Sequence, residues 1–74
     1  MPGLPRVSGK EVLSALLRGG FVESHVRGSH HYLRRAPGGL VIIPVHGNRD
    51  VPLGTLRSIL RQAGLSEEEL RELL

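Results

Sequence analysis

The hydrophobic residues between Ser8 and Gly19 recur every three or four positions, which is the spacing of one helix face. The large ones are Val12, Leu13, Leu16 and Leu17. Ser8, followed three residues later by Glu11, is typical of a capping box, in which each side chain accepts a hydrogen bond from the other residue's backbone N–H. Glycines at 19 and 20 end the pattern, because glycine adopts left-handed backbone conformations at little cost. These signals predict a first helix with one apolar face.

Three short extended segments follow this helix. They cover residues 21–27, 30–35 and 40–45, and they are separated by Gly28-Ser29 and by the turn residues 36–39. The third segment is the richest in β-branched residues, so we expect it to be the most buried strand. Connections this short favour an antiparallel meander.

A second helical pattern begins at Gly54-Thr55, after a polar loop over residues 46–52, and ends at Gly64. Its apolar face consists of Leu56, Ile59 and Leu60. Another capping box, over residues 66–69, begins a short acidic helix that runs to Leu74. With residues 1–7 as a lead-in, the order is α-β-β-β-α plus a small extra helix. This order predicts an α+β fold with helices packed on one face of a three-stranded antiparallel sheet, in a single domain over residues 1–74.

The composition fits a small globular protein. The chain has 74 residues, of which 39% are hydrophobic, and such a length supports one small core. It contains no cysteine, which excludes a disulfide framework and a thiolate metal site. No apolar run approaches the roughly 18 residues of a membrane span, and no signal peptide precedes the first helix. We therefore expect a cytoplasmic protein without a membrane partner.

The positive charge is concentrated before the acidic C-terminal segment. Residues 66–74 hold four Glu and one Arg, a net charge of −3, while the whole chain has a net charge of +3. Residues 1–65 therefore hold nine Lys or Arg against three acids, a net charge of +6. A basic body this small indicates an anionic partner, of which nucleic acid is the most common. A solvated basic surface without a partner is the alternative.

Strand alternation separates the two adjacent histidines. His30, Tyr32 and Arg34 share one face of their strand, and His31, Leu33 and Arg35 share the other. The helices should cover the more apolar face, which Leu33 marks. We therefore expect His31 to lie inward or at the margin of the core, and His30 to point to the open face. A bulge near Gly28 would exchange the two faces.

A histidine beside arginines can cleave RNA without a metal, because RNA carries its own nucleophile in the 2′-OH. Imidazole exchanges protons near neutral pH, and guanidinium groups stabilise the charge that develops on the phosphate oxygens. His30 is the candidate for proton transfer. Tyr32 could stack on a base or donate a hydrogen bond, and Arg34 could contact phosphate. A solvent-exposed strand histidine without a function is the alternative.

Further candidates lie outside this strand. His46 follows the third strand, and a meander brings the end of one strand near the start of its neighbour; a locally bonded loop histidine is the alternative. Lys10, Arg57 and Arg61 are candidate RNA phosphate contacts or solvated helix residues. We expect no metal, since adjacent strand histidines point to opposite faces and a spacing such as His-x3-His is absent.

Several segments resemble the HicA toxin family, also called YcfA-like. They are Gly20-Phe21, Gly28-Ser29-His30-His31, Pro44-Val45-His46-Gly47-Asn48 and the stretch from Gly54 to Leu65. They cover nearly the whole chain in the expected order and spacing, and the last stretch is the most specific.

The resemblance implies a fold like that of a double-stranded RNA-binding domain. It implies an mRNA interferase that cuts transcripts without a metal or other cofactor, and a partner, a HicB-type antitoxin, that binds the toxin and blocks its site. The catalytic histidine of the Gly-Ser-His segment corresponds to His30, and Ser29 and His31 beside it are further candidates for catalysis or RNA contact. A non-catalytic RNA-binding module and a small protein-interaction domain are the competing hypotheses.

Overall fold

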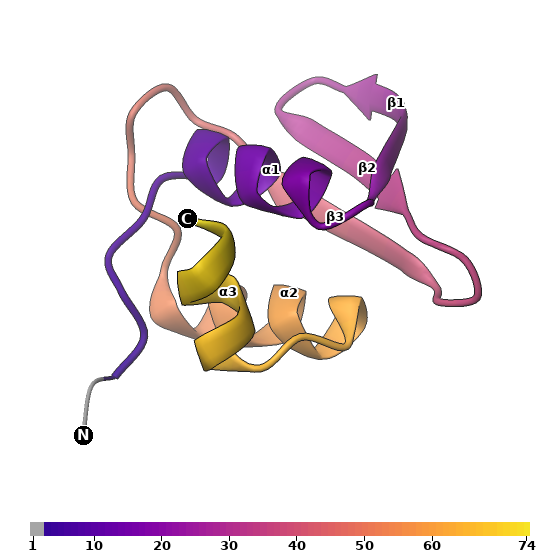
Figure 1. Cartoon of the computed structure of the whole chain (residues 1–74). Helices are drawn as coiled ribbons and strands as arrows, with labels where there is room; N and C mark the ends of the chain where they lie inside the picture. Colours follow the sequence, from indigo (N-terminus) through magenta and orange to yellow (C-terminus); the bar gives the residue numbers. More distant parts are fainter. Residues whose placement is uncertain (1–2) are drawn as a thin grey trace.

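The computed structural model describes residues 3–74, so Met1 and Pro2, the start of the predicted lead-in, lie outside the described residues. The elements are α1 (Gly9–Arg18), β1 (Val22–Arg27), β2 (His30–Arg34), β3 (Leu40–Pro44), α2 (Leu53–Ala63) and α3 (Glu67–Leu73) (Figure 1). The strands form one antiparallel sheet in the order β1-β2-β3. This confirms the predicted α+β fold, with α-β-β-β-α order, a small third helix and an open three-stranded sheet.

Both predicted capping boxes form. Ser8 Oγ accepts a hydrogen bond from the Glu11 backbone N–H at 3.2 Å, and Glu11 Oε1 accepts one from the Ser8 N–H at 2.9 Å. Ser66 and Glu69 repeat this pair at the start of α3. By contrast, α2 begins at Leu53, and its N-cap residue, Pro52, provides no side-chain cap; no acidic residue lies in its first turn. The N-terminal end of α2 therefore keeps the positive end of its dipole uncompensated by its own side chains.

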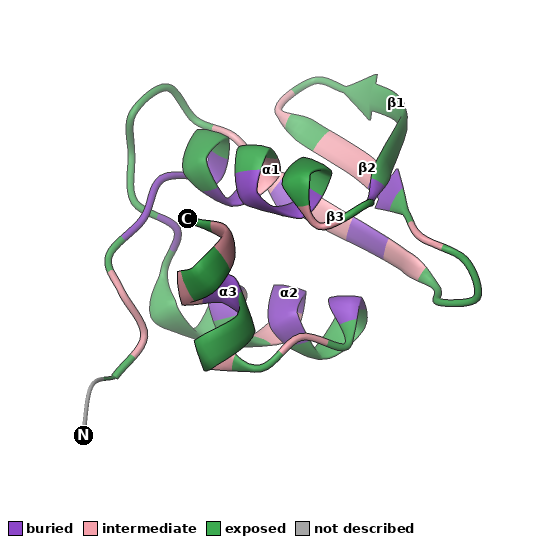
Figure 2. Cartoon of the chain, viewed as in Figure 1, coloured by how far each residue is buried: buried purple, intermediate pink, exposed green. Residues whose placement is uncertain are grey.

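The core lies between one face of the sheet and the helices. Its fully buried members are Val12, Ala15, Leu16, Leu33, Val41, Ile43, Leu56 and Leu70 (Figure 2). As predicted, β3 is the most buried strand. The prediction that Leu17 belongs to the apolar face of α1 is wrong: this side chain is 45% exposed. Ala15 instead completes the buried stripe with Val12 and Leu16, because residues three and four apart share a helix face.

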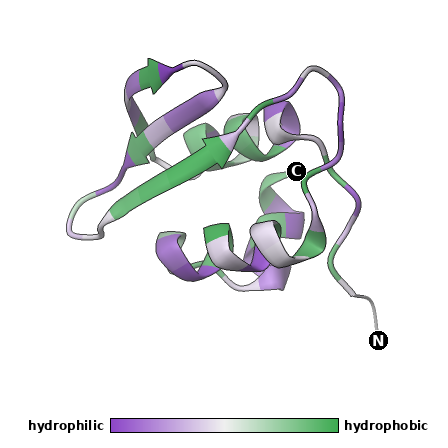
Figure 3. Cartoon of the chain, turned by 180° about the vertical axis from the view of Figure 1, so that it is seen from behind, coloured by the Kyte–Doolittle hydropathy of each residue, from purple (hydrophilic) through white to green (hydrophobic). Residues whose placement is uncertain are grey.

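The β1–β2 hairpin is the most solvent-exposed part of the sheet. Every residue of β1 is exposed, and β1 lies at one edge of the sheet (Figures 1 and 2). Seen from behind in Figure 3, β3 is hydrophobic along its length, whereas β2 beside it is largely hydrophilic. Polar side chains of this hairpin are therefore accessible to a ligand.

A β-bulge interrupts the pairing of β1 with β2. Glu23 pairs with Leu33, but the next pairs are His25 with Tyr32 and Arg27 with His30, so the register shifts at Ser24. The extra residue exchanges the faces to which the following side chains of β1 point. This irregularity decides which residues of β1 share a face with His30.

The exit of β3 is packed tightly against the start of α1. A Cβ added at Gly9 would lie 2.1 Å from the carbonyl oxygen of Pro44. The Val51 N–H donates a hydrogen bond of 2.7 Å to the Val7 carbonyl, which ties the loop after β3 to the segment before α1. These contacts fix the loop that carries His46. Over residues 3–74, no helix combines the length and the apolar character needed to cross a membrane.

Candidate functional site

The two adjacent histidines of β2 point to opposite sides of the sheet, as predicted. Leu33 is fully buried on the side of the helices, and His31 shares that side, paired with the buried Ile43. His30 is exposed and pairs with Pro44 on the opposite, open face. From Tyr32 to His30 the pairing of β2 with both neighbours is regular, so no bulge near Gly28 exchanges the faces.

His31 is tied to a carboxylate at the margin of the core. Its Nδ1 lies 2.6 Å from Glu23 Oε2, and the two side chains are 22% and 35% exposed. The pair joins β1 to β2 on the helix side of the hairpin. This position gives His31 a structural partner and turns it away from the side chain of His30.

Five polar side chains share the open face of the β1–β2 hairpin with the apolar Val22, and we call these five the open-face cluster. They are His25, Arg27, His30, Tyr32 and Arg34. The His25 and Tyr32 rings are stacked, with centroids 4.2 Å apart and planes 14° from parallel. Arg27 is the direct cross-strand partner of His30. The predicted group of His30, Tyr32 and Arg34 is thus brought together and enlarged by two residues of β1.

Sequence reasoning missed His25 and Arg27 as site residues. Strict alternation from the buried Phe21 would place both on the core side with Glu23, and the bulge at Ser24 reverses that assignment. A signal was present, because a histidine and an arginine at core-facing positions conflict with the hydrophobic pattern. A bulge resolves that conflict.

The turn before His30 lies beside the exit of β3. The carbonyl of Ser29 accepts a hydrogen bond of 2.7 Å from the Val45 N–H, directly before His46. His46 therefore lies near the Gly-Ser-His segment, as the meander predicted. Ser29 is half-buried, and its backbone, rather than a side-chain hydrogen bond, makes this connection.

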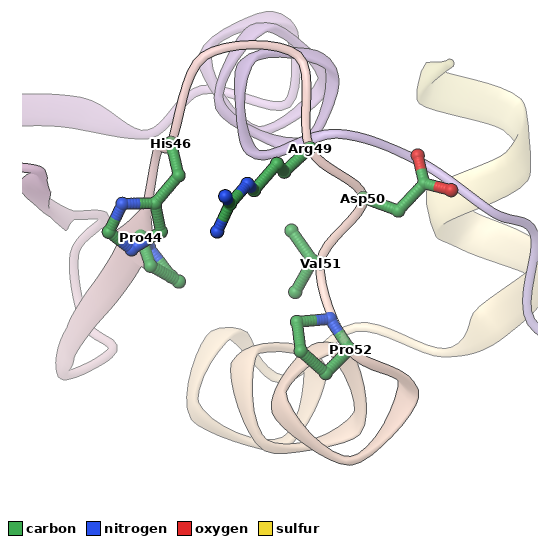
Figure 4. Close-up of a pocket in the computed structure, with 6 residues that line it drawn as sticks. All are labelled: Pro44, His46, Arg49, Asp50, Val51 and Pro52. Carbon is green, nitrogen blue, oxygen red and sulfur yellow. The ribbon is translucent and has the colours of Figure 1, made fainter.

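A hollow of about 150 Å³ opens at this place, and we call it the β3-exit hollow. It is lined by Pro44, His46, Arg49, Asp50, Val51 and Pro52. In Figure 4 the side chains of His46 and Arg49 point toward the hollow, whereas the Asp50 carboxylate points away from it. Because Pro44 is also the cross-strand partner of His30, the hollow adjoins the open-face cluster. Arg49 is a further residue that sequence reasoning missed.

The electrostatics of this region are positive. Among residues 3–74, the ion pairs are His31 with Glu23 and Arg71 with Glu67. Within that part of the chain, Arg27, Arg34 and Arg49 therefore have no carboxylate within 4.0 Å. Pro52 lines the hollow and stands at the N-cap position of α2, where no side chain caps the helix. The positive end of the α2 dipole therefore lies beside the hollow. The site is suited to bind an anion.

The three predicted helix contacts lie outside this group. Lys10 is exposed on α1, and Arg57 and Arg61 are exposed on α2. In the described part of the chain, none of them lines the hollow or is hydrogen-bonded to the open-face cluster. Nor do three or more histidine, aspartate or glutamate side chains there converge as metal ligands would. The open-face cluster and the β3-exit hollow can therefore exchange protons and bind phosphate.

A family model described as HicA toxin of bacterial toxin–antitoxin systems matches residues 9–65. The chain belongs to the HicA toxin family. As a HicA-family protein it is a toxin of a toxin–antitoxin pair, which implies an antitoxin partner. The matched segment contains the whole open-face cluster and the β3-exit hollow, whereas α3 lies beyond it. No curated protein matches the chain.

Proposed function

We propose that this HicA-family toxin is a metal-independent endoribonuclease that cleaves mRNA in the cytoplasm, with His30 as a proton-transfer residue. The observation that carries the proposal is the placement of His30. It is an exposed histidine on an open face, opposite Arg27 and beside an electropositive hollow. A HicB-type antitoxin would neutralise the toxin by covering this face.

The chemistry requires little machinery. RNA supplies the nucleophile, so the protein needs to move protons and to stabilise charge on the phosphate. An imidazole does the first near neutral pH. Arg27 and Arg34, which have no carboxylate partner in the described structure, do the second. No step needs a metal or another cofactor.

The surroundings of His30 support RNA as the substrate. Tyr32 and His25 present stacked rings on which a base can lie. The β3-exit hollow, at about 150 Å³, is smaller than the 300–1,000 Å³ typical of sites for drug-sized ligands. We infer that His46 and Arg49 hold one phosphate or base of a flanking nucleotide there. Ser29 lies at the junction, and the helix cations Lys10, Arg57 and Arg61 would contact more distant phosphates.

The test is cleavage of a labelled single-stranded RNA with EDTA present, by the wild type and by His30→Ala and His31→Ala. We expect His30→Ala to lose activity by about 10²- to 10⁴-fold, the usual contribution of one acid or base. His31→Ala is the matched control, because His31 neighbours His30 but faces the helix side. Provided that circular dichroism shows His31→Ala to be folded, this variant should keep most of the cleavage activity.

Two results would contradict the proposal. Loss of cleavage only in folded His31→Ala would move the active histidine to the helix side. A wild type that binds RNA without ever cutting it would instead establish a non-catalytic RNA-binding module, for which the same unpaired arginines would serve.

A further inference from the structure

The bulge at Ser24 gives the open face a second histidine. From Glu23 to His25 the register shifts, and His25 then stands opposite Tyr32 rather than on the core side. Without the bulge, alternation from Phe21 would point His25 toward the helices. Bulges are over-represented next to active sites, where they redirect side chains. This one places two imidazoles on the same face of one hairpin.

The ring of His25 is held in a defined orientation. It stacks on Tyr32, and its Nδ1 lies 3.1 Å from Ser24 Oγ. The Ser24 hydroxyl donates its single hydrogen to the Tyr32 carbonyl at 3.1 Å, so it accepts from Nδ1–H of His25. Proton exchange is then left to Nε2, to which no protein group within residues 3–74 is hydrogen-bonded. The neutral ring can accept a proton at this atom, and the protonated ring can donate one.

The two histidines are spaced to flank a phosphate. His25 pairs with Tyr32 and His30 pairs with Arg27, so the histidines are diagonal neighbours on adjacent strands. Diagonal neighbours on one sheet face are about 7–8 Å apart, a span that aromatic side chains can bridge through a bound group. Arg27 completes this arrangement with a positive charge directly opposite His30.

We propose that His25 is the second catalytic residue of RNA cleavage, exchanging a proton on the opposite side of the scissile phosphate from His30. This inference rests on the proposed function. One histidine accepts the proton of the 2′-OH while the 2′ oxygen forms its bond to phosphorus. The bond from phosphorus to the 5′ oxygen breaks, and the other histidine donates its proton to that oxygen. The products are a 2′,3′-cyclic phosphate and a 5′-hydroxyl, and no further reactant is consumed.

A leaving-group substitution tests this division of labour. The wild type first identifies the bond that it cuts in a defined oligonucleotide. A second oligonucleotide then carries sulfur in place of the 5′ oxygen at that bond, because a thiolate leaves without being protonated. On the ordinary RNA, His25→Ala and His30→Ala should each lose about 10²- to 10⁴-fold in rate. On the sulfur substrate, only the variant that lacks the proton donor should recover.

His25→Phe separates catalysis from packing. Phenylalanine keeps a ring against Tyr32 but has no nitrogen to exchange a proton, so it should be as impaired as His25→Ala. If His25→Phe cuts like the wild type, the ring has only a structural role and the inference is wrong. It is also wrong if neither alanine variant, or both alike, recover on the sulfur substrate.

The same measurements distinguish this inference from the proposed function. If His30→Ala loses activity while both His25 variants keep full activity, the catalytic role of His25 is wrong and the proposed function still stands. If the wild type cuts neither substrate, the proposed ribonuclease function itself is wrong.

Discussion

The contact between Gly9 and the exit of β3 allows a stability change to be worked out from the structure. In Gly9→Ala, the new Cβ would lie 2.1 Å from Pro44 O and 2.9 Å from Val45 Cα. Both are backbone atoms, so no side-chain rotation relieves the clash. Either α1 or the end of β3 must move.

The expected cost exceeds the gain from a better helix former. Overpacking of this kind costs about 1–3 kcal/mol, and a rigid backbone neighbour places Gly9→Ala at the upper end. Alanine in a helix recovers roughly 0.5–1 kcal/mol relative to glycine. The net loss is then about 2 kcal/mol, out of roughly 4–11 kcal/mol expected for a chain of 74 residues. The melting temperature should fall by about 8–16 °C.

Thermal and urea unfolding followed by circular dichroism would measure this loss. Gly54→Ala is the matched control, because Gly54 also lies in the first turn of a helix but has nothing within 4 Å of an added Cβ. It should be neutral, or stabilised by up to about 1 kcal/mol. If Gly9→Ala is as stable as Gly54→Ala, the close approach of α1 to β3 is not a constraint on this fold.

Three other perturbations test separate parts of the structure. Leu33→Ala should lower the free energy of unfolding by about 2–5 kcal/mol in urea titrations, because Leu33 is fully buried under the helices, and a loss below 1 kcal/mol would contradict that burial. The Ser66 backbone N–H, followed by its hydroxyl and by Arg35, lowers the pKa of Glu69 below its ordinary value. The resulting stabilisation is present above the ordinary carboxylate pKa and disappears as pH falls through the lowered value. Wild type and Glu69→Gln should therefore differ in melting temperature at neutral pH and converge once the pH is below the lowered pKa. Arg49→Ala should weaken binding to all single-stranded RNA sequences, and the slope of log binding constant against log salt concentration should become shallower by about 0.7. An unchanged slope would show that Arg49 does not contact an RNA phosphate.

Local chemistry predicts the element boundaries best where a cap is present. The helices after Ser8 and Ser66 begin at the next residue, as their capping boxes indicate. The start of α2 has no such signal, and this helix begins at Leu53, one residue before the predicted Gly54. The strands were predictable because their turns are short and glycine-rich. The exposure of Leu17 was not, because it depends on which side of α1 meets the sheet.

The candidate site was predictable on β2 but not on β1. The alternation around Leu33 places His30 correctly, because the core marks one face of that strand without ambiguity. On β1 every residue is exposed, so burial gives no such reference, and the one sign of the bulge at Ser24 is that strict alternation would point His25 and Arg27 toward the core. Arg49 escaped prediction for a different reason. Its position depends on how the loop after β3 folds back between β3 and α2, and this is a tertiary property.

The bulge at Ser24 also affects how the molecule behaves at high concentration. An exposed edge strand is a template on which strands of other molecules can pair, which leads to fibres and aggregates. β1 is such an edge, and it carries the exposed valines Val22 and Val26. The extra residue breaks the regular ladder near the middle of the strand, so an incoming strand cannot pair along its full length. Removing the bulge should therefore make the chain prone to aggregate, whatever happens to its chemistry.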